Sequence, residues 1–259
     1  MVSISLDQLF TWLNAFLWPF IRLLSFVGAA PLFGESSIPN RAKVGLAVFM
    51  TLIVAPTLPP LPNVAPGSYE GLFIALQQFL IGTSMALVMR IVFGAVQTAG
   101  EFIGLQMGLS FASFFDPQTG ANTTVLARLM NMMTMLLFLA VNGHLLLLSG
   151  LLHSFELLPI QNQGIDLNGL SVLFQFSSQV LEAGMLLALP LIIVLLTINL
   201  ALGILNRTAQ QLSVFAVGFP ISLSVGFILL WVVLPRTAPF LQRLFDQGYA
   251  HIAKLLGAL

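Results

Sequence analysis

The feature that most constrains this chain is a series of six apolar segments separated by short connectors. They run over residues 9–33, 44–61, 72–108, 125–155, 172–205 and 214–234. A helix needs about 20 apolar residues to cross a hydrocarbon core of about 30 Å. Because lipid offers no partner to backbone N–H and C=O groups, spanning segments of this kind must be helical. The sequence therefore predicts an all-α polytopic membrane protein.

Composition supports this class and excludes others. Only 7% of the 259 residues are charged, whereas a soluble domain carries about 25%. The formal net charge is +0, so there is no basic field of the kind that binds nucleic acid. The chain has no cysteine, which excludes disulfides and thiolate metal sites.

Short polar or proline-rich connectors predict helical hairpins within one membrane domain, residues 1–259. We expect N-terminal hairpins over 1–155, a C-terminal hairpin over 156–234 and a tail over 235–259. In this tail, basic and apolar residues alternate at helical spacing. It therefore predicts an amphipathic helix at a membrane interface or against a partner.

The placement of basic residues gives conflicting topology signals. Arg41 and Lys43 place the first connector in the cytoplasm, and Arg207 does the same for the last one. Six full crossings would then put both chain ends in the periplasm, although the basic tail favours the cytoplasm. We expect one hairpin not to cross completely, and proline-broken Val44–Pro60 is a poor simple span.

Six charged residues lie in or beside the apolar segments, where a central charge costs about 2.5–3.5 kcal/mol. They must pair, or face water or protein. Scattered spacing favours pairing with partner subunits over a polar conduit or ion relay. These residues are Arg22, Arg90, Glu101, Arg128, Glu182 and Arg207.

Small residues recur every fourth position in two segments, which lets helix backbones approach closely. The contact could lie within a hairpin or with another chain, and the spacing does not distinguish them. The first stripe is Gly100, Gly104 and Gly108, and the second is Gly218, Ser222 and Gly226.

The sequence offers no catalytic, metal or cofactor site. GxSxG, Walker A, Rossmann and HExxH patterns are absent. His144, His153 and His251 lack a short metal-ligand spacing. A methionine cluster over residues 130–135 favours core packing over a deformable seal. We expect a protein that is not an enzyme.

Residues 108–122 lie between two of the longest apolar segments, 72–108 and 125–155. Asp116-Pro117 starts a turn and Gly120 permits positive φ, so we expect the helix to break here. Three phenylalanines at this hairpin tip would either anchor in the headgroup layer or fill a hole in a neighbouring structure as a plug. The candidate plug residues are Phe111, Phe114, Phe115, Asp116, Pro117 and Gly120.

Motifs around this segment resemble the FliR family of flagellar biosynthesis proteins, which are related to export-gate subunits of type III secretion systems. The resemblance rests on residues 99–112 (AGEFIGLQMGLSFA), Asp116-Pro117, Asn142-Gly143-His144 and residues 214–220 (VFAVGFP). It continues before and after these motifs and covers most of the chain.

This resemblance implies a non-enzymatic subunit of the flagellar export gate, in the basal body and the bacterial inner membrane. It implies kinked helical hairpins packed into a channel with FliP and FliQ, working with FlhB, through which unfolded flagellar proteins pass. The segment around Phe111 to Gly120 would project into the lumen and help to close it.

Two other hypotheses stay open. A secondary transporter would line a substrate path with Arg22, Arg90, Glu101 and Glu182, although clear inverted repeats are lacking. A purely structural subunit would organise its neighbours without any lumenal element.

Overall fold

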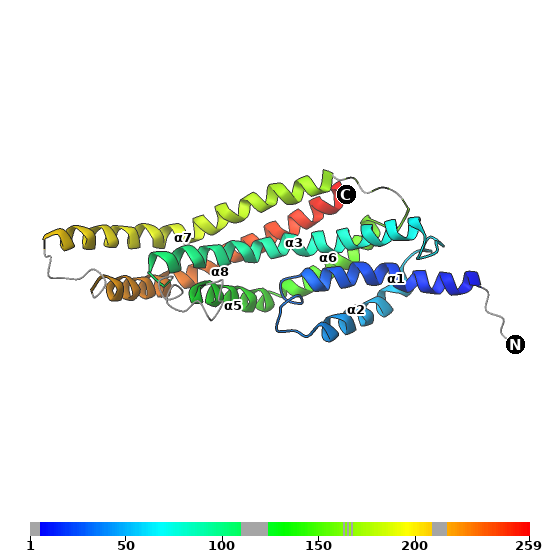
Figure 1. Ribbon diagram of the computed structural model, residues 1–259, viewed down its shortest axis with the longest axis horizontal. Coiled ribbons are helices and arrows are strands. Elements are labelled where there is room, and N and C mark those ends of the chain that lie inside the picture. The colour runs from blue at the N-terminus through cyan, green and yellow to red at the C-terminus, as the bar shows by residue number, and fades with distance from the viewer. Residues whose placement is uncertain (1–5, 110–123, 163, 165, 167, 209–216) are drawn as a thin grey trace. The chain divides into compact units, whose positions relative to one another are not determined.

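The computed structural model describes residues 6–109, 124–162, 164, 166, 168–208 and 217–259. Within these ranges all the regular structure is helical, which confirms the predicted all-α class (Figure 1). The elements are α1 (Leu6–Ala29), α2 (Asn40–Val54), the short 3-10 turn η1 (Ala55–Thr57), α3 (Tyr69–Gln106), α5 (Val125–Ala140), α6 (Gly143–Leu157), α7 (Asn168–Thr208) and α8 (Phe219–Ala258).

Four helices of the described chain are long and apolar enough to cross a membrane: α1, α3, α7 and α8. The pair α5 and α6 would add a fifth span if the two count as one broken crossing. At 15 residues, α2 is only about 22 Å long. By length and composition the described helices allow at most five crossings, and α2 is not among them, in line with the expectation that Val44–Pro60 is a poor span.

The predicted segment 125–155 contains a break that hydropathy did not show. Asn142 adopts left-handed backbone angles, φ 56° and ψ 26°, between α5 and α6. Asparagine visits this conformation more readily than other residues with a Cβ atom, because its short polar side chain bonds locally. The apolar run therefore forms two helices.

Helices α3, α7 and α8 are much longer than one crossing requires. They contain 38, 41 and 40 residues, which corresponds to about 57–62 Å. The hydrocarbon core measures only about 30 Å. Part of each helix therefore has to be accommodated outside the core or by a strong tilt.

The chain divides into two compact units. Helices α3, α7 and α8 each have residues in both units. Unit 1 comprises Met1–Ile91, Asn142–Ser177 and Asp246–Leu259, and unit 2 comprises Val92–Val141 and Ser178–Phe245.

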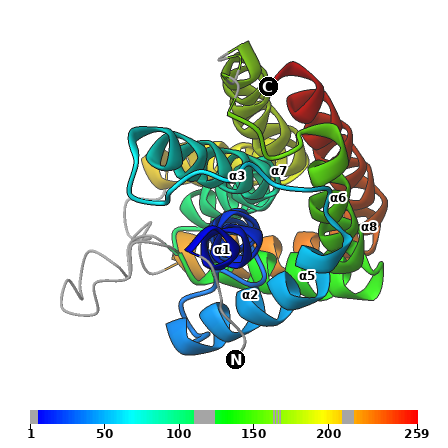
Figure 2. The same ribbon diagram turned by 90° about the vertical axis from the view of Figure 1, so that its right-hand side faces the viewer.

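In unit 1, the core combines apolar side chains from α1, α3 and α6. Trp18 and Phe26 of α1, Ile74 of α3 and Leu147 and Leu151 of α6 are all fully buried or nearly so. Helix α2 packs against α1, as Figures 1 and 2 show. Burial of these large side chains stabilises the unit by about 1.5–3 kcal/mol each.

In unit 2, three phenylalanines join α3, α5 and α8. The ring centroids of Phe93, Phe138 and Phe245 lie 5.2–6.0 Å apart, the range that aromatic pairs prefer. Leu241 and Leu244 of the tail are buried as well. The apolar side of the tail therefore packs partly within this chain, where the sequence had indicated a membrane interface or a partner.

Candidate functional site

The predicted plug residues Phe111, Phe114, Phe115, Asp116, Pro117 and Gly120 lie outside the described residues. The structure does describe the two helix ends that flank them. Helix α3 ends at Gln106 and α5 begins at Val125. The candidate site therefore comprises the described residues on either side of segment 110–123.

Helix α3 ends in a Schellman motif built on Gly108. The Leu109 amide donates to the Gly104 carbonyl at 2.9 Å, and the Gly108 amide donates to Leu105 at 3.1 Å. This pair of bonds requires a left-handed residue after the helix, usually glycine. Gly108 has a φ of 81°. Helix termination, in addition to the predicted close packing, therefore explains a glycine at this position.

Helix α5 begins at a defined cap. The Thr124 hydroxyl accepts a hydrogen bond from the Ala127 amide at 3.2 Å, with extended backbone at Thr124. Such a cap satisfies one of the free N–H groups at the start of a helix. Both ends of segment 110–123 therefore leave from ordered helix termini.

The first small-residue stripe lies at the end of α3, against the start of α5. A Cβ atom added at Gly100 would lie 2.6 Å from the Ala127 Cα atom. One added at Gly104 would lie 3.2 Å from the Thr124 hydroxyl oxygen. The backbones of α3 and α5 thus touch at positions where a side chain would hold them apart.

The second stripe lies against α7 and against the end of α3. The Ser222 hydroxyl donates to the Asn199 side-chain oxygen at 2.8 Å, and the Asn199 amide donates to the Gln106 carbonyl at 3.4 Å. A Cβ atom at Gly226 would lie 2.6 Å from the Met107 side chain. Gly218 is buried just before α8.

Both stripes therefore meet around the end of α3, within unit 2. We call this set the segment base; its residues are Gly100, Gly104, Met107, Gly108, Thr124, Ala127, Asn199, Ser222 and Gly226. Sequence reasoning missed Met107, Ala127, Asn199 and Thr124. Of these four, only Thr124 could have been identified from the sequence, because a threonine directly before an apolar run is typical of a helix N-cap.

Arg22 is the one predicted charge that the described chain encloses completely. Its guanidinium donates to the Gln78 side-chain oxygen at 2.8 Å and to the carbonyls of Ser154 at 2.9 Å and Leu158 at 2.8 Å. It also lies 4.3 Å from the centroid of the Phe155 ring. No described carboxylate pairs with it.

Backbone carbonyls at the end of α6 take the place of a carboxylate as the partners of Arg22. Ser154 is in the last turn of α6 and Leu158 is its C-cap, where the helix dipole concentrates negative partial charge on the terminal carbonyls. A planar guanidinium matches several such acceptors and also stacks on an aromatic ring. Arg22 therefore joins α1, α3 and α6 of unit 1.

The other predicted charges lie on the surface of this chain. Arg90, Arg128, Glu182 and Arg207 are exposed, and Glu101 is partly exposed and accepts a hydrogen bond from Gln97 at 3.2 Å. Unlike Arg22, none of these five side chains is buried within the chain. Their pairing with partner subunits stays a prediction.

The histidines and methionines have packing contacts rather than a shared site. His251 stacks on Phe176 at 4.2 Å, and Met130 is buried, whereas Met132 is exposed. In the part of the chain that is described, no group of three or more acidic, histidine or cysteine residues is arranged to hold a metal.

These helices define a multi-pass membrane protein with its candidate site at helix ends. The sequence matches the family described as Bacterial export proteins, family 1, over residues 13–248. It is 45% identical over 259 residues to the flagellar biosynthetic protein FliR of Escherichia coli (strain K12), covering 100% of this chain and 99% of that protein. The FliR protein of Bacillus subtilis (strain 168) is 35% identical over 246 residues, covering 93% and 94%. The chain belongs to the FliR family of bacterial export proteins.

Proposed function

We propose that this protein is a subunit of the flagellar type III export gate in the bacterial inner membrane. It forms part of the channel wall, and segment 110–123 contributes to closing the channel. It assembles with FliP and FliQ and works with FlhB, and unfolded flagellar proteins pass through the channel. It carries out no enzymatic reaction.

The observation that carries this proposal is the segment base. The Schellman end of α3 and the Thr124 cap of α5 anchor both ends of segment 110–123. The close contact of Gly100 with Ala127 keeps these ends together. A closure element needs such fixed ends, because its position then depends on the fold and not on the length of the segment.

The residues of segment 110–123 supply the chemistry of closure. Phe111, Phe114 and Phe115 are large apolar side chains that exclude water and ions from a narrow pore. Gly108 and Gly120 flank them and permit backbone angles that other residues resist. Movement about these positions would open the path for a substrate.

A role in the channel wall fits the exposed apolar surface of α7 and α8. Phe174, Ile193 and Leu205 of α7 and Phe227 and Trp231 of α8 are all exposed on this chain, and Phe174 and Leu205 are about 46 Å apart along the helix. Because these helices are longer than the hydrocarbon core is thick, lipid chains alone would leave part of such a surface in water. Neighbouring subunits would cover the rest.

The decisive experiment compares ion leakage through the assembled complex. Replacing Phe111, Phe114 and Phe115 by alanine, or deleting residues 113–120, is expected to raise membrane conductance while partner subunits still co-purify. Phe49→Ala, at an exposed position of α2, is the matched control and should leave conductance at the wild-type level. Unchanged conductance in a fully assembled triple variant would reject the closure role.

Two measurements separate the alternative hypotheses. A photo-crosslinker at position 114 should capture a translocating flagellar substrate, whereas a purely structural subunit would give no such adduct. Purified chain alone in liposomes should move no solute down a gradient. Solute transport under those conditions would instead support an independent transporter.

A further inference from the structure

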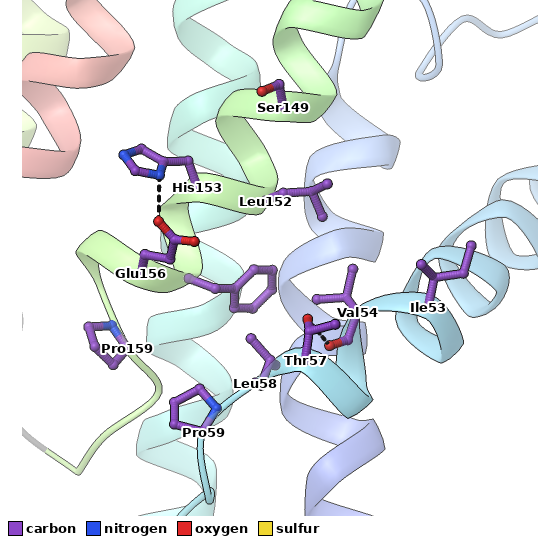
Figure 3. A pocket seen from close by; sticks show the side chains of 11 residues that line it. Ile53, Val54, Thr57, Leu58, Pro59, Ser149, Leu152, His153, Glu156 and Pro159 are labelled. Atoms are coloured by element: carbon purple, nitrogen blue, oxygen red, sulfur yellow. Dashed lines mark hydrogen bonds and ion pairs between the residues drawn. The ribbon is translucent and has the colours of Figure 1, made fainter.

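A cavity of about 590 Å³ opens in unit 1, where the end of α2 and η1 approach the end of α6 (Figure 3). Its apolar lining includes Ile53, Leu152 and Phe155. Its polar side chains include His153 and Glu156, which the dashed line in Figure 3 joins. The volume falls within the range of small-molecule sites, about 300–1,000 Å³.

A second cavity, of about 250 Å³, lies on the other flank of α6, against the last turns of α8. Leu146, Leu147 and Gly150 of α6 and Ile252 and Leu256 of α8 line it. This cavity is apolar apart from Tyr249 and His153. His153 lines both cavities, so a single ligand lying over this residue would reach each of them.

The two cavities overlap along α6 but differ in polarity. The α2/α6 cavity has polar side chains at Ser149, His153 and Glu156. The α6/α8 cavity is lined by apolar residues of α6 from Leu146 to Leu157, which is the last residue of the helix. A polar headgroup therefore fits the first cavity and an acyl chain fits the second.

The site presents one exposed carboxylate, that of Glu156. Glu156 lies 2.8 Å from the His153 imidazole, and its side chain is 76% exposed. The guanidinium of Arg22 lies on the Phe155 ring but donates to Gln78, Ser154 and Leu158. A headgroup that carries an ammonium can donate to the free oxygen of Glu156, whereas a purely anionic headgroup meets repulsion.

From this geometry we propose that unit 1 binds a phospholipid with a primary ammonium headgroup, as in phosphatidylethanolamine. The headgroup lies in the α2/α6 cavity against the His153–Glu156 pair. One acyl chain lies in the apolar cavity between α6 and α8. All the residues of this site belong to unit 1, and the proposal does not depend on the proposed gate function.

The test measures lipid retention by the detergent-extracted assembly with native mass spectrometry. Phosphatidylethanolamine and phosphatidylglycerol with identical acyl chains are added in equal amounts. Wild-type protein should retain the ethanolamine lipid about tenfold better, the effect of one charge-assisted contact. Glu156→Gln should bring the two lipids to about equal retention. Glu70→Gln, an acidic residue in the first turn of α3, should keep the wild-type preference.

A second pair of variants tests the acyl-chain cavity. A Cβ atom at Gly150 meets no atom within 4 Å, and the same holds at Gly203 of α7. Gly150→Leu should fill the cavity and lower retention of both lipids severalfold, whereas Gly203→Leu should change neither. Equal retention of the two lipids by wild-type protein would overturn the headgroup assignment, and wild-type retention by Gly150→Leu would overturn the chain assignment.

A photo-crosslinker at exposed Ser149 distinguishes lipid from protein at this site. An adduct with the ethanolamine lipid in the native membrane supports the proposal. An adduct with a partner subunit in place of lipid would show that protein covers the site, and it would overturn the proposal.

Discussion

Replacing Arg22 by lysine keeps the positive charge of unit 1 but removes the planar group that its neighbours require. Lysine carries three donors on a point-like ammonium, whereas arginine presents five in a fixed fork. The ammonium cannot reach Gln78, Ser154 and Leu158 together in the arrangement that the guanidinium adopts. The substitution therefore tests whether the fork, and not the charge, holds α1, α3 and α6.

The expected loss follows from the contacts. At least one buried acceptor is left without a donor, and Gln78 is only 1% exposed; each such acceptor costs about 1–3 kcal/mol. The lost stacking on Phe155 adds about 0.5–2 kcal/mol. We expect Arg22→Lys to lower the free energy of unfolding by about 2–4 kcal/mol, and Tm by about 5–15 °C.

The measurement is thermal unfolding of the purified assembly, followed by intrinsic fluorescence. Arg41→Lys makes the same chemical change at an exposed position of α2 and should leave Tm unchanged. Gln78→Leu removes one partner and should destabilise by itself. Because Arg22 and Gln78 share one hydrogen bond, the double variant should lose less than the sum of the single losses.

Two results would refute this reasoning. A Tm for Arg22→Lys equal to that of Arg41→Lys would show that charge alone suffices. Strict additivity of the Arg22→Lys and Gln78→Leu losses would show that their hydrogen bond contributes nothing to stability.

Three further substitutions test helix contacts and helix ends. Gly100→Ala should destabilise unit 2 by about 1–3 kcal/mol, because its Cβ atom meets the Ala127 backbone; Gly203→Ala, with open space around it, should be neutral or stabilising in the same Tm assay. Thr124→Ala should cost about 1 kcal/mol through the lost cap, and Thr124→Ser should restore most of it. Asn142→Val should lower Tm because a β-branched residue resists the left-handed angles, whereas Asn142→Gly should match or exceed wild type.

The sequence predicted the features that depend on local chemistry. Apolar run length identified α1, α3 and α7, and the prolines after Val54 coincide with the end of α2. The predicted boundary at residue 235 was wrong, because α8 continues through Pro235 and Pro239 into the tail. The break at Asn142 was missed, because hydropathy does not register a left-handed residue between two apolar stretches. Local patterns thus gave the elements but not every end.

Tertiary partners were beyond the reach of one sequence. Arg22 bonds residues 56 to 136 positions away, and nothing in local spacing selects Gln78 or Leu158. The sequence indicated that its charge needed compensation and favoured partner subunits as the source, which is wrong for Arg22 because its partners lie in this chain. It could not show that a helix end, and not a carboxylate, provides it.

The two small-residue stripes show what the three-dimensional arrangement adds to a correct pattern. Read separately, each stripe predicts only a close helix contact, with no indication of the partner helix. In unit 2, Gly100 approaches α5, and Gly226 approaches Met107 of the α3 terminus. Both stripes therefore bring helix backbones to the same place, the end of the helix that leads into segment 110–123. A substitution at either stripe should disturb that helix end first, which is why Gly100→Ala tests the segment base more directly than changes within the segment.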